Sequence, residues 1–149
     1  MTKPKFHKYN GNILSDNVKI FDTAKIYGNA KLYDNVMLSG NSEIYGKAKL
    51  YNDVKIYNSA KIHGNAQLFN NVQIGGDSNV YGNAKIYDKS EVTGHAKVYG
   101  NVILTGRVFV TDNAKVFGCA RAHGNTLYIC GNIKICGKAR LKNINELFK

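Results

Sequence analysis

Every sixth residue from Leu14 to Ala122 is aliphatic, which gives an unbroken run of nineteen positions. Four residues after each of them comes a small or β-branched residue, as at Val18, Ala24 and Ala30. A period of six does not match the 3.6 residues of a helical turn, and the intervening residues are rich in Tyr and β-branched types. The pattern therefore predicts short strands separated by bends, repeated as the turns of a solenoid.

Each six-residue unit alternates in polarity as a strand does. In the unit that begins at Ala30, we expect Ala30 and Leu32 to point inward and Lys31 and Tyr33 to point outward. Asp34-Asn35 then forms the bend, because Asp, Asn and Gly tolerate left-handed backbone geometry at low cost. One strand and one bend thus account for each period.

A slower period of eighteen residues groups these units in threes. The inward position of one strand in three holds Val18, Val36, Val54, Val72, Ser90, Val108 and Thr126. Glycines at one bend in three recur without a gap, at Gly28, Gly46, Gly64, Gly82, Gly100 and Gly118. Three strands per turn give a triangular cross-section, and residues 12–142 then form about seven turns stacked at about 4.8 Å.

Three units carry a resemblance to a known family: Lys25-Ile26-Tyr27-Gly28-Asn29-Ala30, Lys61-Ile62-His63-Gly64-Asn65-Ala66 and Lys85-Ile86-Tyr87-Asp88-Lys89-Ser90. The chain resembles the hexapeptide-repeat proteins, which are left-handed parallel β-helices. It differs in one detail, since many members place the small or acidic residue directly after the aliphatic one. The resemblance implies an all-β fold and the left hand, which is opposite to ordinary parallel crossovers. Nearly pure arrays of the Lys-Ile-Tyr-Gly-Asn-Ala type are found in uncharacterised bacterial and phage proteins.

The ends of the chain lie outside the repeat. The single domain divides into an N-terminal cap or arm, the β-helix and a C-terminal cap, over residues 1–11, 12–142 and 143–149. Phe6 and Tyr9 are candidates to cover the first turn. Ile144, Leu147 and Phe148 have helical spacing, which predicts a short capping helix over the last turn.

One residue interrupts the period near its end. The aliphatic positions slip by one between Ala122 and Ile129, around Asn125-Thr126-Leu127, so one extra residue is expected to bulge there. The insertion is either a tolerated irregularity or a small functional protrusion that carries His123 and Tyr128. The sequence leaves both interpretations open.

The cysteines and the termini indicate a cytoplasmic protein without a cofactor. Cys119, Cys130 and Cys136 are odd in number, so a disulfide framework is not expected, and a reducing compartment fits them. They lack CxxC or nearby His spacing, so no metal site is predicted. No apolar run follows the basic N-terminus, and no stretch is apolar enough to cross a membrane, so neither a signal peptide nor a membrane partner is expected.

The outward residues form columns on three faces, and the formal charge of the chain is +11. Face 1 carries Lys31, Lys49, Gln67, Lys85, Ile103 and Arg121 beside Tyr33, Tyr51, Phe69, Tyr87, Thr105 and His123. Face 2 carries Lys25, Glu43, Lys61, Asn79, Lys97 and Lys115 beside Tyr27, Tyr45, His63, Tyr81, Tyr99 and Phe117. Face 3 is mixed, with Lys19, Met37, Lys55, Gln73, Glu91 and Phe109 beside Phe21, Ser39, Tyr57, Gly75, Thr93 and Thr111.

Two faces thus pair a basic column with an aromatic column, and we expect them to bind a partner. Lys neutralises phosphate or carboxylate, and Tyr offers a flat surface for bases or for a protein. The predicted contact residues are Lys31, Tyr33, Lys49, Tyr51, Lys85, Tyr87, Arg121, Tyr27, Tyr45, Lys61, Tyr81, Lys97, Tyr99 and Lys115. An acidic host protein, nucleic acid and a phosphorylated small ligand stay open as partners, as does a plain solvated β surface. Self-association as a trimer or dimer is a further alternative, and the resemblance favours trimers.

An enzyme is the main alternative, because the resembled family includes acyltransferases with a catalytic His and a loop that interrupts the coils. This chain lacks such a loop. His95 at a bend is the best candidate for a general base, with Glu91 and Asp112 nearest by coil position, and His123 is a second candidate. We therefore expect a non-enzymatic binding protein. A phage-encoded inhibitor of a host defence system, such as an anti-CRISPR, fits that description by analogy, and a structural or assembly protein is the third alternative.

Overall fold

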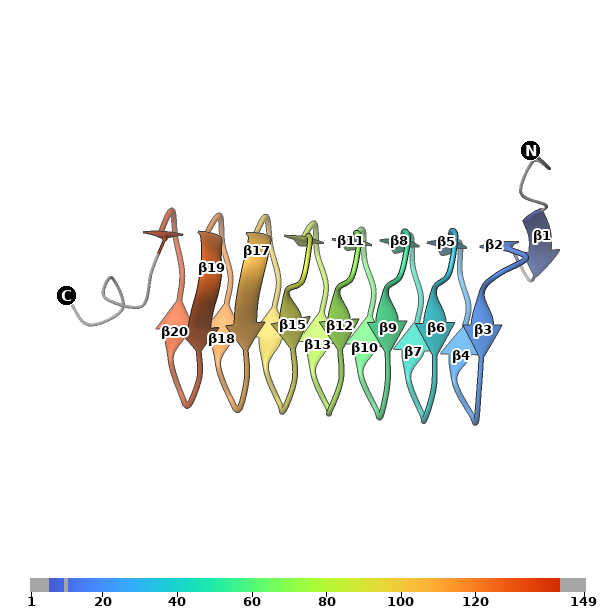
Figure 1. Ribbon diagram of the computed structural model, residues 1–149, viewed down its shortest axis with the longest axis horizontal. Helices are drawn as coiled ribbons and strands as arrows, with labels where there is room; N and C mark the ends of the chain where they lie inside the picture. Colours follow the sequence, from blue (N-terminus) through green and yellow to red (C-terminus); the bar gives the residue numbers. More distant parts are fainter. Residues whose placement is uncertain (1–5, 10, 143–149) are drawn as a thin grey trace.

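The chain forms a parallel β-solenoid whose turns stack along one long axis. The computed structural model describes residues 6–9 and 11–142. Figure 1 shows the turns side by side, with β1 (Phe6–Tyr9) and β20 (Lys134–Ile135) at opposite ends of the stack. About seven turns of eighteen residues make up the solenoid, and each full turn contributes one strand to each of three faces. The predicted all-β solenoid with this period is confirmed.

The strands of each face pair in register along the axis. Face 1 is built from β2 (Asn12–Ser15), β5 (Lys31–Leu32), β8 (Lys49–Leu50), β11 (Gln67–Leu68), β14 (Lys85–Ile86), the first half of β17 (Ile103–Val110), the first half of β19 (Arg121–Ile129) and β21 (Arg140–Leu141). Face 2 is built from β4 (Lys25–Ile26), β7 (Glu43–Ile44), β10 (Lys61–Ile62), β13 (Asn79–Val80), β16 (Lys97–Val98), β18 (Lys115–Val116) and β20 (Lys134–Ile135). Face 3 is built from β3 (Lys19–Ile20), β6 (Met37–Leu38), β9 (Lys55–Ile56), β12 (Gln73–Ile74), β15 (Glu91–Val92) and the second halves of β17 and β19.

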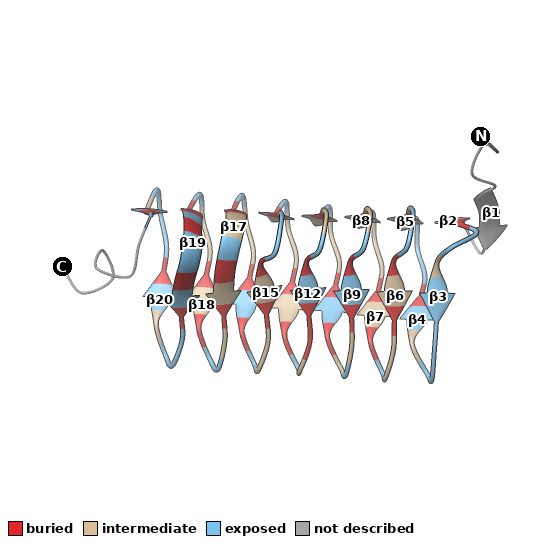
Figure 2. Ribbon diagram, in the orientation of Figure 1, coloured by how far each residue is buried: buried red, intermediate tan, exposed pale blue. Residues whose placement is uncertain are grey.

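The core is a continuous stripe that runs through the centre of every turn. Leu32, Leu50 and Leu68 are 0% exposed, and they stack in the parallel register that the eighteen-residue period predicts. Ala30 and Val36 fill the inward corner positions and are also 0% exposed. Figure 2 shows the buried positions recurring on every coil. Each buried Ile or Leu contributes about 1.5–3 kcal/mol before conformational entropy, and repetition makes a thin core sufficient.

The bends between strands form three rows, one along each corner of the solenoid. In each row, residues with a positive φ recur at the equivalent position of successive turns. Corner A, between faces 2 and 1, holds Gly28, Gly46, Gly64, Gly82, Gly100, Gly118 and Gly137. Corner B, between faces 1 and 3, holds Asp34, Asn52, Asn70, Asp88 and Gly106. Corner C, between faces 3 and 2, holds Asp22, Gly40, Asn58, Gly76, Gly94, Asp112 and Gly131. These are the residue types that tolerate left-handed geometry, so the sequence places its bends where the backbone needs them.

The insertion predicted near the end of the repeat lies in β19. Gly106 pairs with Gly124 and Val108 with Leu127, so β19 has one residue more than β17 between these pairs. Leu127 is 0% exposed and Thr126 is exposed. The prediction that Thr126 occupies an inward position is therefore wrong, because the bulge moves Leu127 into that place.

A strand outside the repeat pairs with the first turn on face 1. Strand β1 (Phe6–Tyr9) forms an antiparallel pair with β2, and no other pairing of β1 is found among the described residues. On face 3 of this turn, Ile20 is 44% exposed although it occupies an inward position of the repeat. The predicted capping helix at 143–149 lies outside the described residues. The described part of the chain contains no helix, and so none long and apolar enough to cross a membrane.

Candidate functional site

The aromatic column of face 2 is a continuous stack of six rings. Tyr27, Tyr45, His63, Tyr81, Tyr99 and Phe117 lie with neighbouring ring centroids 4.6–5.1 Å apart and interplanar angles of 2–4°. The spacing equals the distance between strands, because each ring comes from the same position of successive turns. Every interior ring therefore has another ring against each of its two faces. The side that remains for a partner consists of ring edges and phenol hydroxyls.

Face 1 has a shorter stack of the same kind. Tyr33, Tyr51, Phe69 and Tyr87 lie with centroids 4.7–4.9 Å apart and interplanar angles of 0–9°. The column continues with Thr105 and His123, whose Oγ1 and Nδ1 atoms are 2.7 Å apart. The structure thus brings together the predicted tyrosines of both faces, as stacks rather than as separate flat platforms.

Basic side chains stand beside both stacks. On face 1, Lys31 pairs in register with Lys49, and Arg121 pairs with Arg140. On face 2 the column continues past Lys115 to Lys134. Sequence reasoning did not name Lys134 and Arg140, because the one-residue insertion shifts both out of the eighteen-residue spacing. The signal that could have found them is the return of the six-residue period after the insertion, at Ile129, Ile135 and Leu141.

Acidic side chains are almost absent from this part of the surface. Among the described residues, faces 1 and 2 and corner A carry thirteen basic side chains: Lys25, Lys61, Lys97, Lys115, Lys134, Lys47, Lys138, Lys31, Lys49, Lys85, Arg121, Arg140 and Lys142. The single acid there is Glu43, which lies 3.7 Å from the Lys61 Nζ and accepts a hydrogen bond of 2.8 Å from the Tyr27 hydroxyl. Partial burial, together with this carboxylate, raises the pKa of Tyr27 to about 12.

The opposite part of the surface has the reverse balance. The seven aspartates all lie at corners B and C, at Asp16, Asp34, Asp53, Asp88, Asp22, Asp77 and Asp112, and Glu91 lies on face 3. The described basic residues there are Lys19, Lys55, Lys89 and Arg107. The net positive charge of the described residues is therefore concentrated on two adjoining faces and the edge between them, hereafter the basic surface.

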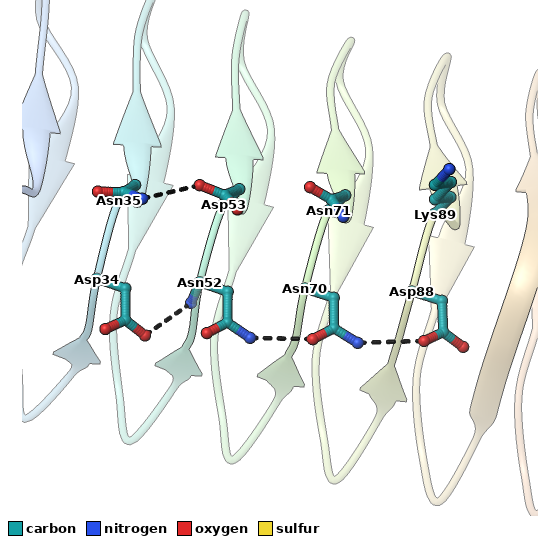
Figure 3. A pocket seen from close by; sticks show the side chains of 8 residues that line it. All are labelled: Asp34, Asn35, Asn52, Asp53, Asn70, Asn71, Asp88 and Lys89. Carbon is teal, nitrogen blue, oxygen red and sulfur yellow. Dashed lines mark hydrogen bonds between the residues drawn. The ribbon is translucent and has the colours of Figure 1, made fainter.

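Corner B forms a groove whose polar groups bond to one another. Figure 3 shows two rows of side chains, Asp34, Asn52, Asn70 and Asp88 in one and Asn35, Asp53, Asn71 and Lys89 in the other. The Asn52 amide donates to Asn70 at 2.9 Å, and the Asn70 amide donates to Asp88 at 3.1 Å. No group of three or more His, Cys, Asp or Glu residues suited to a metal occurs among the described residues. These hydrogen bonds join corner residues of successive turns, so the groove stabilises the stacking of the turns.

The histidines and cysteines that were considered for chemistry do not converge. The His95 Nδ1 lies 3.4 Å from Asp77, and their side chains are 68% and 61% exposed. The expectation that Glu91 or Asp112 is the nearest carboxylate is wrong, because Asp77 stands at the same corner position one turn earlier. His123 lies on face 1, away from His95 at corner C. Cys119, Cys130 and Cys136 are exposed free thiols.

Comparison of the chain with models of protein families, with curated proteins and with solved structures gives no match.

Proposed function

We propose that this is a non-enzymatic binding protein that engages an anionic macromolecule through its basic surface. The observation that carries the proposal is the segregation of charge: within residues 11–142, faces 1 and 2 and corner A carry thirteen basic side chains and one acid. A solenoid that needed lysines for solubility alone could interleave them with its aspartates. Here the aspartates stand at the two other corners, so they do not neutralise the lysine columns.

The energetics of the columns favour an anionic partner. Ammonium groups in register on neighbouring strands lie about 4.8 Å apart and repel by about 0.9 kcal/mol per pair in water. Splaying of the side chains and salt reduce this repulsion without removing it. Anionic groups laid along the columns would convert the repulsion into attraction and release counterions. A long-range positive field of this kind also raises the association rate of an anionic partner.

The shape of the surface favours a macromolecule over a small phosphorylated ligand. Small-ligand sites are concave and cover most of the ligand. The hollows found on this protein are open grooves, such as the one along Asp34, Asn52 and Asn70 at corner B. A similar open groove runs along Lys97, Lys115 and Lys134 on face 2. Faces 1 and 2 are built from straight columns of side chains, which suit a partner that extends along several turns.

A charge-matched pair of variants tests the proposal. The first variant replaces Lys31, Lys49, Lys85 and Arg121 on face 1 with Gln. The control replaces Lys19, Lys55, Lys89 and Arg107, on face 3 and corner B, with Gln. Both remove three lysines and one arginine, so they have equal net charge. We expect weaker retention on a sulfated polyanion column, at lower eluting salt, for the first variant, with the control close to the wild type. Equal retention of the two variants would reject the basic surface.

The other interpretations of the sequence make different predictions. A structural or assembly protein requires the tyrosine faces to be buried in an oligomer, and sedimentation equilibrium that shows a monomer would contradict it. An acyltransferase requires His95 or His123 at the wall of a subunit cleft.

We also propose, from the repeat, that the coil is left-handed and of the hexapeptide-repeat type, which an experimental structure would test. Inhibition of a host defence system by a phage protein is one setting for such a surface, and its test is protection of a phage in cells that express the chain.

A further inference from the structure

We infer that the anionic partner is double-stranded nucleic acid, bound through its phosphate backbone without stacking of bases on the tyrosines. This inference rests on the proposed binding function and names the partner class. It follows from three properties of the basic surface: the faces of the interior rings are covered, the cations stand in straight columns, and exposed apolar anchors are scarce.

The covered ring faces exclude the usual way of holding single strands. Proteins that bind single-stranded nucleic acid stack successive bases on free aromatic faces. Tyr45, His63 and Tyr81 are sandwiched within one stack, with centroid separations of 4.6–4.9 Å. A base would have to separate two rings and the strands that carry them. Hydroxyls at the ring edges can instead donate hydrogen bonds to phosphate oxygens, as Tyr side chains do at nucleic-acid backbones.

The columns of cations suit a regular line of phosphates. Lys97, Lys115 and Lys134 follow one another in register on face 2, and Arg121 and Arg140 do so on face 1. Seven turns extend about 34 Å, which is about ten steps of a duplex at about 3.4 Å each. Over that length a duplex carries a phosphate for about every 1.7 Å of its axis, and the phosphates on the side that faces the protein can pair with cations of the columns.

The lack of apolar anchors argues against an acidic protein as the partner. Protein interfaces draw most of their affinity from a few buried aromatic or apolar side chains near the centre. The large hydrophobic side chains that are exposed in the described chain are Ile20, Phe21, Tyr27 and Tyr128. Ile20, Phe21 and Tyr128 lie on face 3, and Tyr27 lies at the end of its stack. At the centre of the basic surface the aromatic rings present only their edges, and polar side chains flank them.

The test measures binding of three fluorescently labelled probes by anisotropy: a 20-base-pair DNA duplex, one of its strands, and polyglutamate of similar charge. We expect the duplex to bind at least as tightly as the strand, with no dependence on sequence. Affinity should fall with salt: a plot of the logarithm of the binding constant against the logarithm of the salt concentration should have a slope near −0.9 for each phosphate neutralised. In the variant of Lys31, Lys49, Lys85 and Arg121 the slope should be shallower by about three to four, since each lost contact removes about 0.9. The charge-matched control should retain the wild-type slope.

The outcomes separate this inference from the proposed function. Binding of polyglutamate with no binding of the duplex at low salt would keep an anion-binding surface and overturn nucleic acid as the partner. Binding of none of the three probes would overturn both the nucleic-acid partner and the anion-binding surface. Single-strand binding at least ten times tighter than duplex binding, with quenching of 2-aminopurine placed in the strand, would overturn backbone recognition in favour of base stacking.

Discussion

The ring of Tyr128 stacks on the ring of Phe109, with centroids 4.8 Å apart, although nineteen residues separate them instead of eighteen. The extra residue is absorbed at corner B, where exposed Asn125 and Thr126 stand between Gly124 and buried Leu127. The insertion therefore shifts the sequence numbering of the columns without shifting the columns themselves.

Deletion of Thr126 should be tolerated, because it restores the eighteen-residue spacing and leaves Leu127 opposite Val108. We expect a change in stability within about 1 kcal/mol, which is about 2–4 °C in the thermal midpoint for a chain of this size. The matched control deletes Asn65, which stands between Gly64 and Ala66 at corner A. Its loss leaves that corner one residue short and would turn the following side chains to the wrong face.

Circular dichroism during heating checks this pair of deletions. We expect the chain without Asn65 to lose several kcal/mol or to fail to fold, since it also loses the hydrogen bond from Asn65 to Asn83 at 3.1 Å. Equal damage from the two deletions would show that the bulge is an integral part of the coil.

The six-residue and eighteen-residue periods predict which side chains point inward and where the chain bends. The inward places of Ala30 and Leu32, and the bends at the glycines, follow from alternation and backbone preference, and the structure confirms them. The period does not predict which residue an insertion displaces from the core, so the inward position was wrongly assigned to Thr126 instead of Leu127. Asp77 lies beside His95, although Glu91 and Asp112 were expected to be the nearest carboxylates by coil position. Asp77 stands eighteen residues before His95, at the same corner position of the preceding turn.

The candidate site was only partly predictable for a related reason. The period gives the column to which each residue belongs, and the columns of Tyr33 and Lys31 are as predicted. It does not give the orientation of the side chains. That the rings lie face to face, which decides whether a base can stack on them, depends on packing between turns. The segregation of the aspartates to corners B and C was present in the sequence and became visible once the corners were placed.

Replacement of Gly64 by Ala should destabilise the coil more than the same change at Gly131. Both glycines have a left-handed backbone, with φ of 67° and 68°. A Cβ at Gly64 would lie 2.9 Å from the Gly82 nitrogen, whereas a Cβ at Gly131 would meet nothing within 4 Å. Gly131→Ala therefore carries the conformational cost alone, about 1–2 kcal/mol. Gly64→Ala adds a displacement of the neighbouring backbone, and we expect a clearly larger loss in urea unfolding. Similar losses would mean that the turns can separate at little cost.

Ser42→Ala should stabilise the protein, and Ser78→Ala should destabilise it. The two serines occupy the same inward position two turns apart, and both are 0% exposed. The Ser42 hydroxyl has no hydrogen-bond partner among the described residues, whereas the Ser78 hydroxyl donates to the Gly75 carbonyl at 2.7 Å. Removing an unsatisfied buried hydroxyl should gain about 1 kcal/mol, and removing a bonded one should cost about as much. Alanine is already present in this column at Ala60. Chemical denaturation of both variants checks the opposite signs, and a loss of stability in both would contradict the prediction.

His63 should make the stability of the protein depend on pH in weakly acidic solution. Its ring lies between Tyr45 and Tyr81, with centroids 4.6 Å and 4.9 Å away. Burial in the stack lowers the pKa of His63 below its usual 6.5; the charge of Lys61 acts in the same direction, and the Asn79 side chain opposes it. The unfolded chain then binds a proton more readily than the folded one. Stability is therefore full above pH about 6.5 and declines as the pH falls from there toward the lower folded pKa.

His63→Tyr provides the matched variant, since Tyr stands at the equivalent place in the turns on both sides and does not titrate in this range. We expect the free energy of unfolding of the variant to lose the part of its acid dependence that His63 contributes, with little change near neutral pH. Urea unfolding of both proteins between pH 5 and 8 measures the difference directly. Parallel curves for the two proteins across that interval would show that the stacked imidazole titrates alike in the folded and unfolded chains, and that the stack accepts its charge without loss.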